Sequence, residues 1–263
     1  MEITADNLGR ALLLAAHPDD ETIACSGLLQ RATSSLAVFA VDGAPPRYGF
    51  EQQFGSLQNY SAARFREASL ALGSIPACSF RRLARQDGTW FVDQHLFLEL
   101  PEAFRSLCQI AREYSPDLVV SHAFEGGHID HDACHILAVR IGKGFDVRTL
   151  EFPLYWQAEG GEDVFQQFRK SREDEIVLTL SEQELDVKRR MLAEYRTQQD
   201  LTAVFHPGTE RFRPMIHCDG AKPAWPGYHY ENRRKVLKAE EFSRRIAELE
   251  KSELVDTAGP INR

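Results

Sequence analysis

Short apolar runs separated by amphipathic segments most strongly constrain the fold of this 263-residue chain. Runs of this kind are typical of strands buried on both faces of a parallel sheet, and we predict three of them, at residues 11–16, 36–41 and 117–122. Segments with a helical period lie between them, as at residues 61–73 and 98–114. This alternation predicts an α/β fold in which helices cover both faces of a mainly parallel sheet.

The remaining segments continue the same pattern, and the chain length fits one hydrophobic core, so residues 1–263 are predicted to form a single domain. We expect a loop at residues 48–59. A second, longer loop is expected at residues 200–230, close to the active site, because this stretch is rich in Pro, Gly and aromatic residues without periodicity. Further strands are expected at 79–83, 150–156 and 175–180, and further helices at 19–31, 130–141, 182–196 and 232–254.

Composition and charge exclude several classes of protein. The 39 acidic and 31 basic residues give a net charge of −8, which lacks the basic footprint of a nucleic-acid-binding protein. The apolar runs are too short to span a bilayer, and no secretory signal is visible. Five cysteines without CxxC spacing favour free thiols in a reducing cytoplasm. We therefore expect a soluble, cytoplasmic and mildly acidic protein, and oligomerisation stays open.

Two clusters of ionisable residues follow two of the predicted strands. The first is His17-Pro18-Asp19-Asp20-Glu21, directly after strand 11–16, and the second is His128-Ile129-Asp130-His131-Asp132, after strand 117–122. Ligands bind at the carboxyl ends of parallel strands, and two His with one carboxylate suit a catalytic zinc that keeps one position open for water. For the first cluster alone, the alternative is a helix N-terminus with acidic residues in its first turn.

Motifs of other enzyme classes are absent from the sequence. No Gly-x-Gly-x-x-Gly follows the first strand, so the dinucleotide-binding fingerprint is missing from a Rossmann-like arrangement. Neither a phosphate-binding lysine loop nor a Gly-x-Ser-x-Gly elbow occurs. His131 and His135 have the spacing of a zincin pair, but Asp132 stands where that motif requires Glu, so we expect His135 to pack or to support a ligand.

The two clusters together resemble the PIG-L/LmbE-like family of metal-dependent N-deacetylases, which includes N-acetylglucosaminyl-inositol deacetylases. The resemblance rests on Ala16 to Glu21 and on Gly127-His128-x-Asp130-His131, and extends more weakly over roughly residues 11–200. Ile129 departs from the proline that is usual in the family, and Cys25-Ser26 departs from Cys-Gly. We expect Ile129 to alter the stiffness of the loop more than the chemistry, and the change at Cys25-Ser26 is mild.

The resemblance implies a role for each motif residue. His17, Asp20 and His131 correspond to the ligands of a zinc ion, with Fe²⁺ as the alternative metal. Asp19 corresponds to the general base that accepts a proton from water, and a carboxylate beside a ligating carboxylate suits that task.

Three further residues are assigned in the same way. His128 corresponds to the histidine that stabilises the tetrahedral intermediate or protonates the leaving amine, and Asp130 is expected to orient a neighbouring histidine. Arg64, in the family's Arg-x-x-Glu position, is expected to bind a substrate hydroxyl or phosphate. The alternative for Arg64 is an exposed helix arginine paired with Glu67 or Glu99.

The function expected from this resemblance is zinc-dependent hydrolysis of the N-acetyl group of an amino sugar in a small glycoconjugate, with release of acetate. One alternative is an amidase that cleaves a bulkier amide or thiol conjugate at the same metal site. An alternative of another class is a non-catalytic binding protein, although such a protein is expected to have lost a ligand or Asp19.

Overall fold

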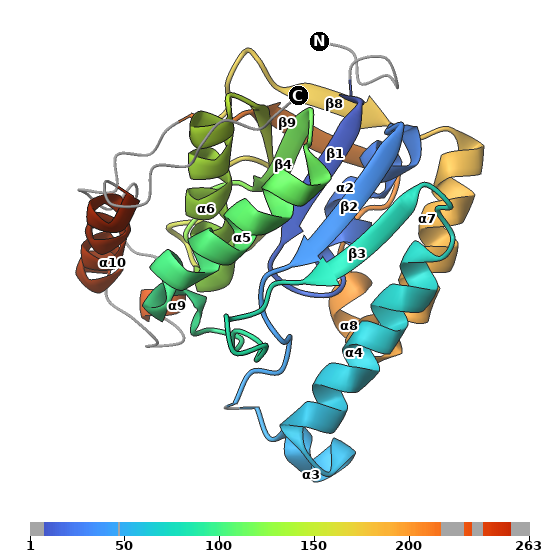
Figure 1. The fold of residues 1–263 in the computed structure, drawn as a ribbon. Helices are drawn as coiled ribbons and strands as arrows, with labels where there is room; N and C mark the ends of the chain where they lie inside the picture. Colours follow the sequence, from blue (N-terminus) through green and yellow to red (C-terminus); the bar gives the residue numbers. More distant parts are fainter. Residues whose placement is uncertain (1–7, 47, 217–228, 233–238, 254–263) are drawn as a thin grey trace.

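A computed structural model of the chain describes residues 8–46, 48–216, 229–232 and 239–253 (Figure 1). The predicted strands and helices of the first half are present, with boundaries shifted by a few residues. They are β1 (Arg10–Ala15), α2 (Asp20–Arg31), β2 (Ser34–Phe39), α4 (Leu57–Leu72), β3 (Cys78–Arg82), α5 (Leu100–Tyr114), β4 (Leu118–His122) and α6 (Ile129–Phe145).

The main sheet has seven strands in the order β3-β2-β1-β4-β5-β9-β8. Strands β3, β2, β1, β4 and β5 (Arg148–Phe152) are parallel, whereas β9 (Thr209–Pro214) runs antiparallel to both of its neighbours, β5 and β8 (Ile176–Thr179). A short hairpin of β6 (Tyr155–Gln157) and β7 (Asp163–Phe165) lies outside this sheet. The predicted mainly parallel sheet is confirmed. Strand order reverses between β1 and β4, which is where ligands bind in open α/β sheets.

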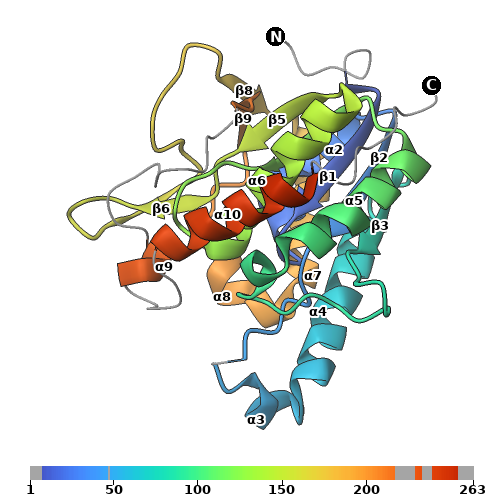
Figure 2. The same cartoon turned by 60° about the vertical axis from the view of Figure 1, so that its left-hand side comes forward.

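Helices cover both faces of the sheet, as predicted (Figures 1 and 2). Leu12, Leu14 and Val119 point to the face covered by α5, α6 and α10 (Ala239–Glu253). Leu13 and Val120 point to the face covered by α2, α4 and α7 (Glu182–Glu194). Alternate residues of one strand therefore enter two cores, which explains why these strands are apolar throughout.

Two expected loops contain regular structure. Residues 48–59 include α3 (Phe50–Phe54) and the first turn of α4. Gly49 and Gly55 flank α3 with positive φ values of 71° and 80°, a conformation that glycine adopts readily, and so they mark the two ends of this short helix. Residues 200–230 include most of α8 (Gln199–Thr202), all of β9 and the start of α9 (His229–Asn232).

Strand β9 was missed because a charged side chain occupies one of its buried positions. Glu210 is buried and pairs with buried Lys188 of α7 at 2.8 Å, so the strand lacks an apolar alternation. Residues 217–228, which include His217, Trp225 and Tyr228, lie outside the described residues. Among the helices that the structure describes, none is long and apolar enough to cross a membrane.

Candidate active site

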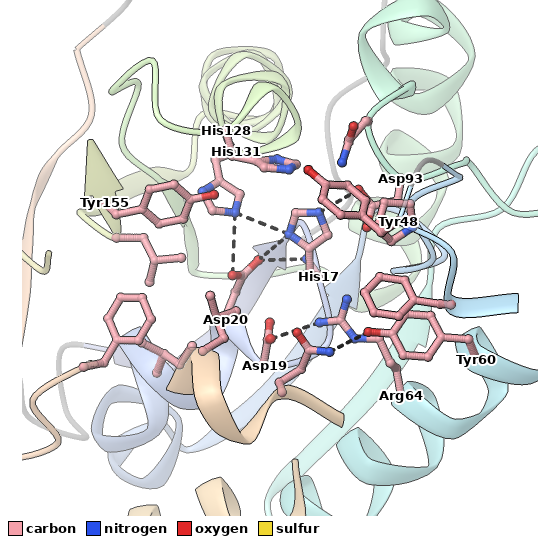
Figure 3. A pocket seen from close by; sticks show the side chains of 18 residues that line it. His17, Asp19, Asp20, Tyr48, Tyr60, Arg64, Asp93, His128, His131 and Tyr155 are labelled. Atoms are coloured by element: carbon pink, nitrogen blue, oxygen red, sulfur yellow. Dashed lines mark hydrogen bonds and ion pairs between the residues drawn. The ribbon is translucent and has the colours of Figure 1, made fainter. Parts of the chain in front are cut away.

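The two motifs meet at the reversal of strand order. The first motif follows β1 and begins α2, while the second ends the loop after β4 and begins α6, and β1 pairs with β4. Figure 3 shows His17, Asp20 and His131 turned toward one another, with His128 beside them. All four side chains are buried and line one cavity of about 180 Å³. The structure therefore brings the predicted ligands together.

The three predicted ligands place donor atoms at nearly equal separations. His17 Nδ1 lies 3.4 Å from Asp20 Oδ2 and 3.3 Å from His131 Nε2, and His131 Nε2 lies 3.6 Å from Asp20 Oδ1. Ligands about 2.0–2.2 Å from a tetrahedral ion are separated by about 3.3–3.6 Å from one another. The donor set and its spacing fit a divalent ion such as zinc.

Three overlapping groups of described residues bring ligand atoms within 4.8 Å of one another, and each predicted ligand belongs to at least one group, although no single group contains all three. These groups are His17/His128/His131, His17/Asp93/His128/Asp130 and Asp20/His122/His131.

His122 is a poor ligand although it lies close to Asp20. Its Nε2 is 3.3 Å from Asp20 Oδ2, but it already accepts a hydrogen bond of 3.0 Å from the backbone N–H of Ala16. Burial lowers the pKa of His122, which keeps its ring neutral. The ring stacks on His131 at 4.0 Å between centroids and 10° between planes. His122 therefore supports the orientation of His131.

His17 faces carboxylates on both sides of its ring. Its Nε2 lies 3.4 Å from Asp93 Oδ1 and 3.6 Å from Asp130 Oδ2, while Nδ1 faces Asp20. Burial lowers the pKa of His17, but the negative charge of Asp93 and contacts with Asp130 and Asp20 outweigh it and raise the pKa well above its ordinary value. An environment this anionic favours a cation. Asp130 contacts a neighbouring histidine, in keeping with its predicted role.

Asp93 is a site residue that the sequence analysis missed. It is buried in the loop after β3, far from both motifs along the chain, and no motif surrounds it. A carboxylate behind a ligating histidine fixes the ring tautomer and strengthens the ligand. Asp93 Oδ1 lies 3.4 Å from His17 Nε2, as such a carboxylate would, and Asp93 also belongs to one of the groups that bring ligand atoms close together.

Asp19 has a strained backbone at the start of α2. Its φ is 142° and ψ is −34°, values that a non-glycine residue rarely adopts, and such strain concentrates at functional sites. Its side chain makes no capping hydrogen bond, so the alternative of a simple helix cap does not account for this carboxylate. The strained backbone N–H donates to buried Glu21 Oε2 at 2.9 Å, and Glu21 Oε1 accepts from Tyr195 Oη.

Arg64 reaches Asp19 from helix α4. Its Nη2 donates to Asp19 Oδ2 at 2.9 Å and to the Pro18 carbonyl oxygen at 2.8 Å, and Nη1 donates to the Gly43 carbonyl oxygen at 2.8 Å. The alternative of an exposed arginine paired with Glu67 or Glu99 is wrong, since Arg64 is only 4% exposed.

The contacts of Arg64 differ from those expected of a substrate-binding arginine. Both terminal nitrogens are committed to protein oxygens, although the side chain does line the cavity. Direct binding of substrate by Arg64 stays a prediction, and the geometry favours a role in holding Asp19. Burial raises the pKa of Asp19 to about 7, with the Arg64 charge opposing this rise.

His128 caps helix α6 through one ring nitrogen. Its Nδ1 accepts a hydrogen bond of 3.2 Å from the backbone N–H of Asp130. In the neutral ring the proton then resides on Nε2, which leaves Nε2–H as the donor. The preceding Gly127 is required by a close approach, because a Cβ there would lie 2.0 Å from the Tyr155 carbonyl oxygen.

His135 packs away from the ligand atoms. Its Nδ1 contacts the His122 carbonyl oxygen at 3.0 Å and Glu151 Oε2 at 3.2 Å. It belongs to none of the three candidate ligand groups. These contacts support the expectation that His135 supports the site from behind.

A family model matches residues 12–141 of this chain, and its description is PIG-L, GlcNAc-PI de-N-acetylase. Over these residues, about half of the chain, the sequence matches the PIG-L family. The matched range contains both motifs and the sheet strands that carry them. The match confirms the family predicted from the two motifs, and thereby the assignment to a family of deacetylases. No curated protein sequence matches the chain.

Solved structures share the fold of this PIG-L protein at low sequence identity. The zinc-inhibited form of teicoplanin deacetylase is 17% identical, covers 80% of this chain and 99% of its own, and has a TM-score of 0.57. N,N'-diacetylchitobiose deacetylase from Pyrococcus horikoshii is 14% identical, with coverages of 80% and 85% and a TM-score of 0.50. A conserved protein from Thermus thermophilus is 19% identical, with coverages of 79% and 96% and a TM-score of 0.53. The predicted fold class is confirmed.

Proposed function

We propose that this protein is a zinc-dependent N-deacetylase that releases acetate from an N-acetylated amino sugar in a small glycoconjugate. The observation that carries the proposal is the close approach of His17, Asp20 and His131 in a buried cavity: the two ring nitrogens lie 3.3 Å apart, and each lies 3.4–3.6 Å from one of the two oxygens of Asp20. The family match supports acetamide hydrolysis, and the diacetylchitobiose deacetylase supports an N-acetylated sugar as the substrate class.

His17, Asp20 and His131 would hold the metal ion. Asp93 and Asp130 lie beside Nε2 of His17, at 3.4 and 3.6 Å, and a cation bound at Nδ1 would offset the burial of these two carboxylates. When bound, zinc supplies a Lewis acid that polarises an amide carbonyl and lowers the pKa of water to about 7.

Asp19 is proposed as the general base. Its neighbour Asp20 faces the two histidines, whereas Asp19 faces Arg64 in the same cavity, so the two carboxylates are available for different tasks. Hydrolysis requires a group that accepts a proton from water and returns it to the departing amine. Arg64 and Glu21 fix the side chain and the backbone of Asp19 for this transfer.

His128 is proposed to stabilise the negative charge that develops on the amide oxygen. With Nδ1 accepting the Asp130 N–H, the neutral ring offers one donor, Nε2–H, to the cavity that it lines. Protonation of the amine by His128 would require a doubly protonated ring and loss of the α6 cap. The cap therefore favours oxyanion stabilisation over amine protonation.

The proposal extends to the cellular setting. Cys25, Cys78, Cys108 and Cys134 are free thiols, which supports a reducing cytoplasm.

Acetate release from a panel of N-acetylglucosamine glycosides, with metal analysis of the same sample, tests the function. We expect about one divalent ion per chain, loss of acetate release after prolonged chelation, and recovery on addition of zinc. Fe²⁺ added under anaerobic conditions shows whether iron replaces zinc. Full activity of metal-free protein would contradict the proposal.

A further inference from the structure

A second cavity shares part of its lining with the cavity that holds the two motifs. The two cavities measure about 180 and 290 Å³ and share Phe50, Gln198 and Leu201 in their linings. The second is otherwise lined by residues 196–200, so it lies between α3 and the segment that leads into α8. The two cavities, which we call the groove, together offer more room than an acetamide group needs.

Aromatic rings line the groove where the two cavities meet. Phe50 stacks on Tyr60 with ring centroids 4.2 Å apart and planes 16° apart, and Tyr48 stacks on Phe50 at 6.1 Å. Figure 3 shows Tyr48 and Tyr60 on the side of His17 opposite to Tyr155. From the other segment, Leu201 lines both cavities and Phe205 lines the inner one. At the junction, Phe50 and Leu201 provide an apolar side chain from each segment, and Gln198 is the polar residue between the two cavities.

Part of this apolar surface is open to solvent. Tyr48 is 49% exposed and Leu201 is 47% exposed, although both line the cavity that contains the motifs. Two polar side chains of the inner cavity are already engaged: Gln198 Nε2 donates to Tyr60 Oη at 2.7 Å and to the Thr197 carbonyl oxygen at 2.8 Å, and Arg64 Nη2 donates to Asp19 Oδ2 at 2.9 Å. The junction offers apolar contact more readily than hydrogen bonds to sugar hydroxyls.

We propose that the substrate carries an apolar group, attached to the N-acetylated amino sugar, that lies between Phe50 and Leu201. This inference rests on the proposed deacetylase function, because Asp19 and Asp20 line the groove. Each buried methylene group improves binding by up to about fourfold, so a short alkyl chain or a phenyl ring has a measurable effect.

The test compares the methyl, hexyl and phenyl β-glycosides of N-acetylglucosamine as substrates of the zinc-loaded protein. We expect kcat/KM for the hexyl glycoside to exceed that for the methyl glycoside by about tenfold or more. The hexyl and phenyl glycosides together show whether a chain or a ring fits better. Calorimetric binding to the Asp19→Asn variant measures the same preference without turnover.

Two exposed positions of one segment provide a matched pair of variants. Leu201→Asn places a polar amide at the junction, so we expect the hexyl-to-methyl ratio to fall about fivefold. Val204→Asn makes a comparable change at a residue that is 52% exposed and lines neither cavity, and we expect it to leave the ratio unchanged.

The outcomes separate this inference from the proposed function. Equal kcat/KM and equal affinity for the three glycosides would overturn the inference while leaving deacetylation intact. An unchanged ratio in Leu201→Asn would overturn it as well. If no glycoside released acetate but the hexyl glycoside still bound more tightly than the methyl glycoside, the apolar subsite would stand and the deacetylase proposal would fail.

Discussion

Arg64 Nη2 donates a hydrogen bond of 2.9 Å to Asp19 Oδ2, and both side chains are buried. The arginine is on α4 and the aspartate precedes α2, so the contact joins two helices on one face of the sheet at the cavity. The same guanidinium also holds the carbonyl oxygens of Pro18 and Gly43. Arg64 thereby fixes the position of one carboxylate beside another, and this arrangement allows Asp19 and Asp20 different tasks.

The first prediction concerns this positioning role. Arg64→Lys keeps the positive charge but removes the guanidinium group that donates hydrogen bonds to three oxygens. We therefore expect kcat to fall about 10–100-fold while the metal content stays at the parent level. Arg66→Lys is the matched control, because Arg66 lies on the same helix and is exposed. An increase in KM with kcat unchanged would instead support the predicted contact between Arg64 and substrate.

A second prediction separates Asp19 from Asp20. Asp19→Asn keeps the size of the side chain but cannot accept a proton at neutral pH, so the variant is expected to retain metal and lose about 10²–10⁴-fold in kcat. Asp20→Asn removes an anionic ligand and is expected to lower both metal content and activity. Metal analysis and steady-state kinetics of both variants provide the measurement. If Asp19→Asn lost the metal and Asp20→Asn kept it, Asp19 would be the metal ligand and Asp20 the general base.

Acid stability is predicted from a pair far from the cavity. The Arg31 guanidinium and the capping contacts with Ser181 lower the pKa of Glu184 from 4.5 to about 2. A lowered pKa in the folded state stabilises the protein above about pH 4.5, and this contribution is lost as the pH falls from 4.5 toward 2. Since the pair is partly exposed, we expect Glu184→Gln to lower the free energy of unfolding by only about 1 kcal/mol at pH 7.

Urea denaturation at pH 7, 5, 4 and 3 checks the sign of that effect. The difference between the parent protein and Glu184→Gln is expected to shrink below about pH 4.5. Glu182→Gln, an exposed change on the same helix, provides the control. A difference that stays constant down to pH 3 would assign the effect to helix capping alone.

The parts of the fold that could be predicted from sequence are those with a local signal. Strands β1, β2 and β4 are recognisable because both of their faces are buried, which makes each a continuous apolar run. The two motifs are recognisable because their residues are contiguous and each follows such a strand. Pairing of β1 with β4 then brings them together without further information.

The parts that could not be predicted depend on contacts between distant residues. Glu210 is buried because Lys188 neutralises it, and neither residue alone predicts a strand in the core. The expected partners of Arg64 lie elsewhere, since Glu67 accepts from Thr197 and Glu99 pairs with Arg85. Tertiary contacts of this kind override the patterns that a single sequence displays.

The last prediction concerns Asp93, which no sequence pattern indicated. Its Oδ1 lies 3.4 Å from His17 Nε2, on the side of the ring opposite to the ligand atom Nδ1. Asp93→Asn removes the negative charge of the side chain and keeps its volume. Without that charge beside Nε2, the His17 ring is expected to bind a metal ion less tightly. We expect zinc affinity to fall about 10–100-fold, with the fold unchanged. Zinc titration against a competing chelator measures the affinity directly, and at saturating zinc we expect most of the activity to return.

Asp87→Asn, an exposed change in the same loop, is the matched control. If the Asp93 variant bound zinc as tightly as the parent protein but stayed inactive, Asp93 would act on the substrate and not through His17.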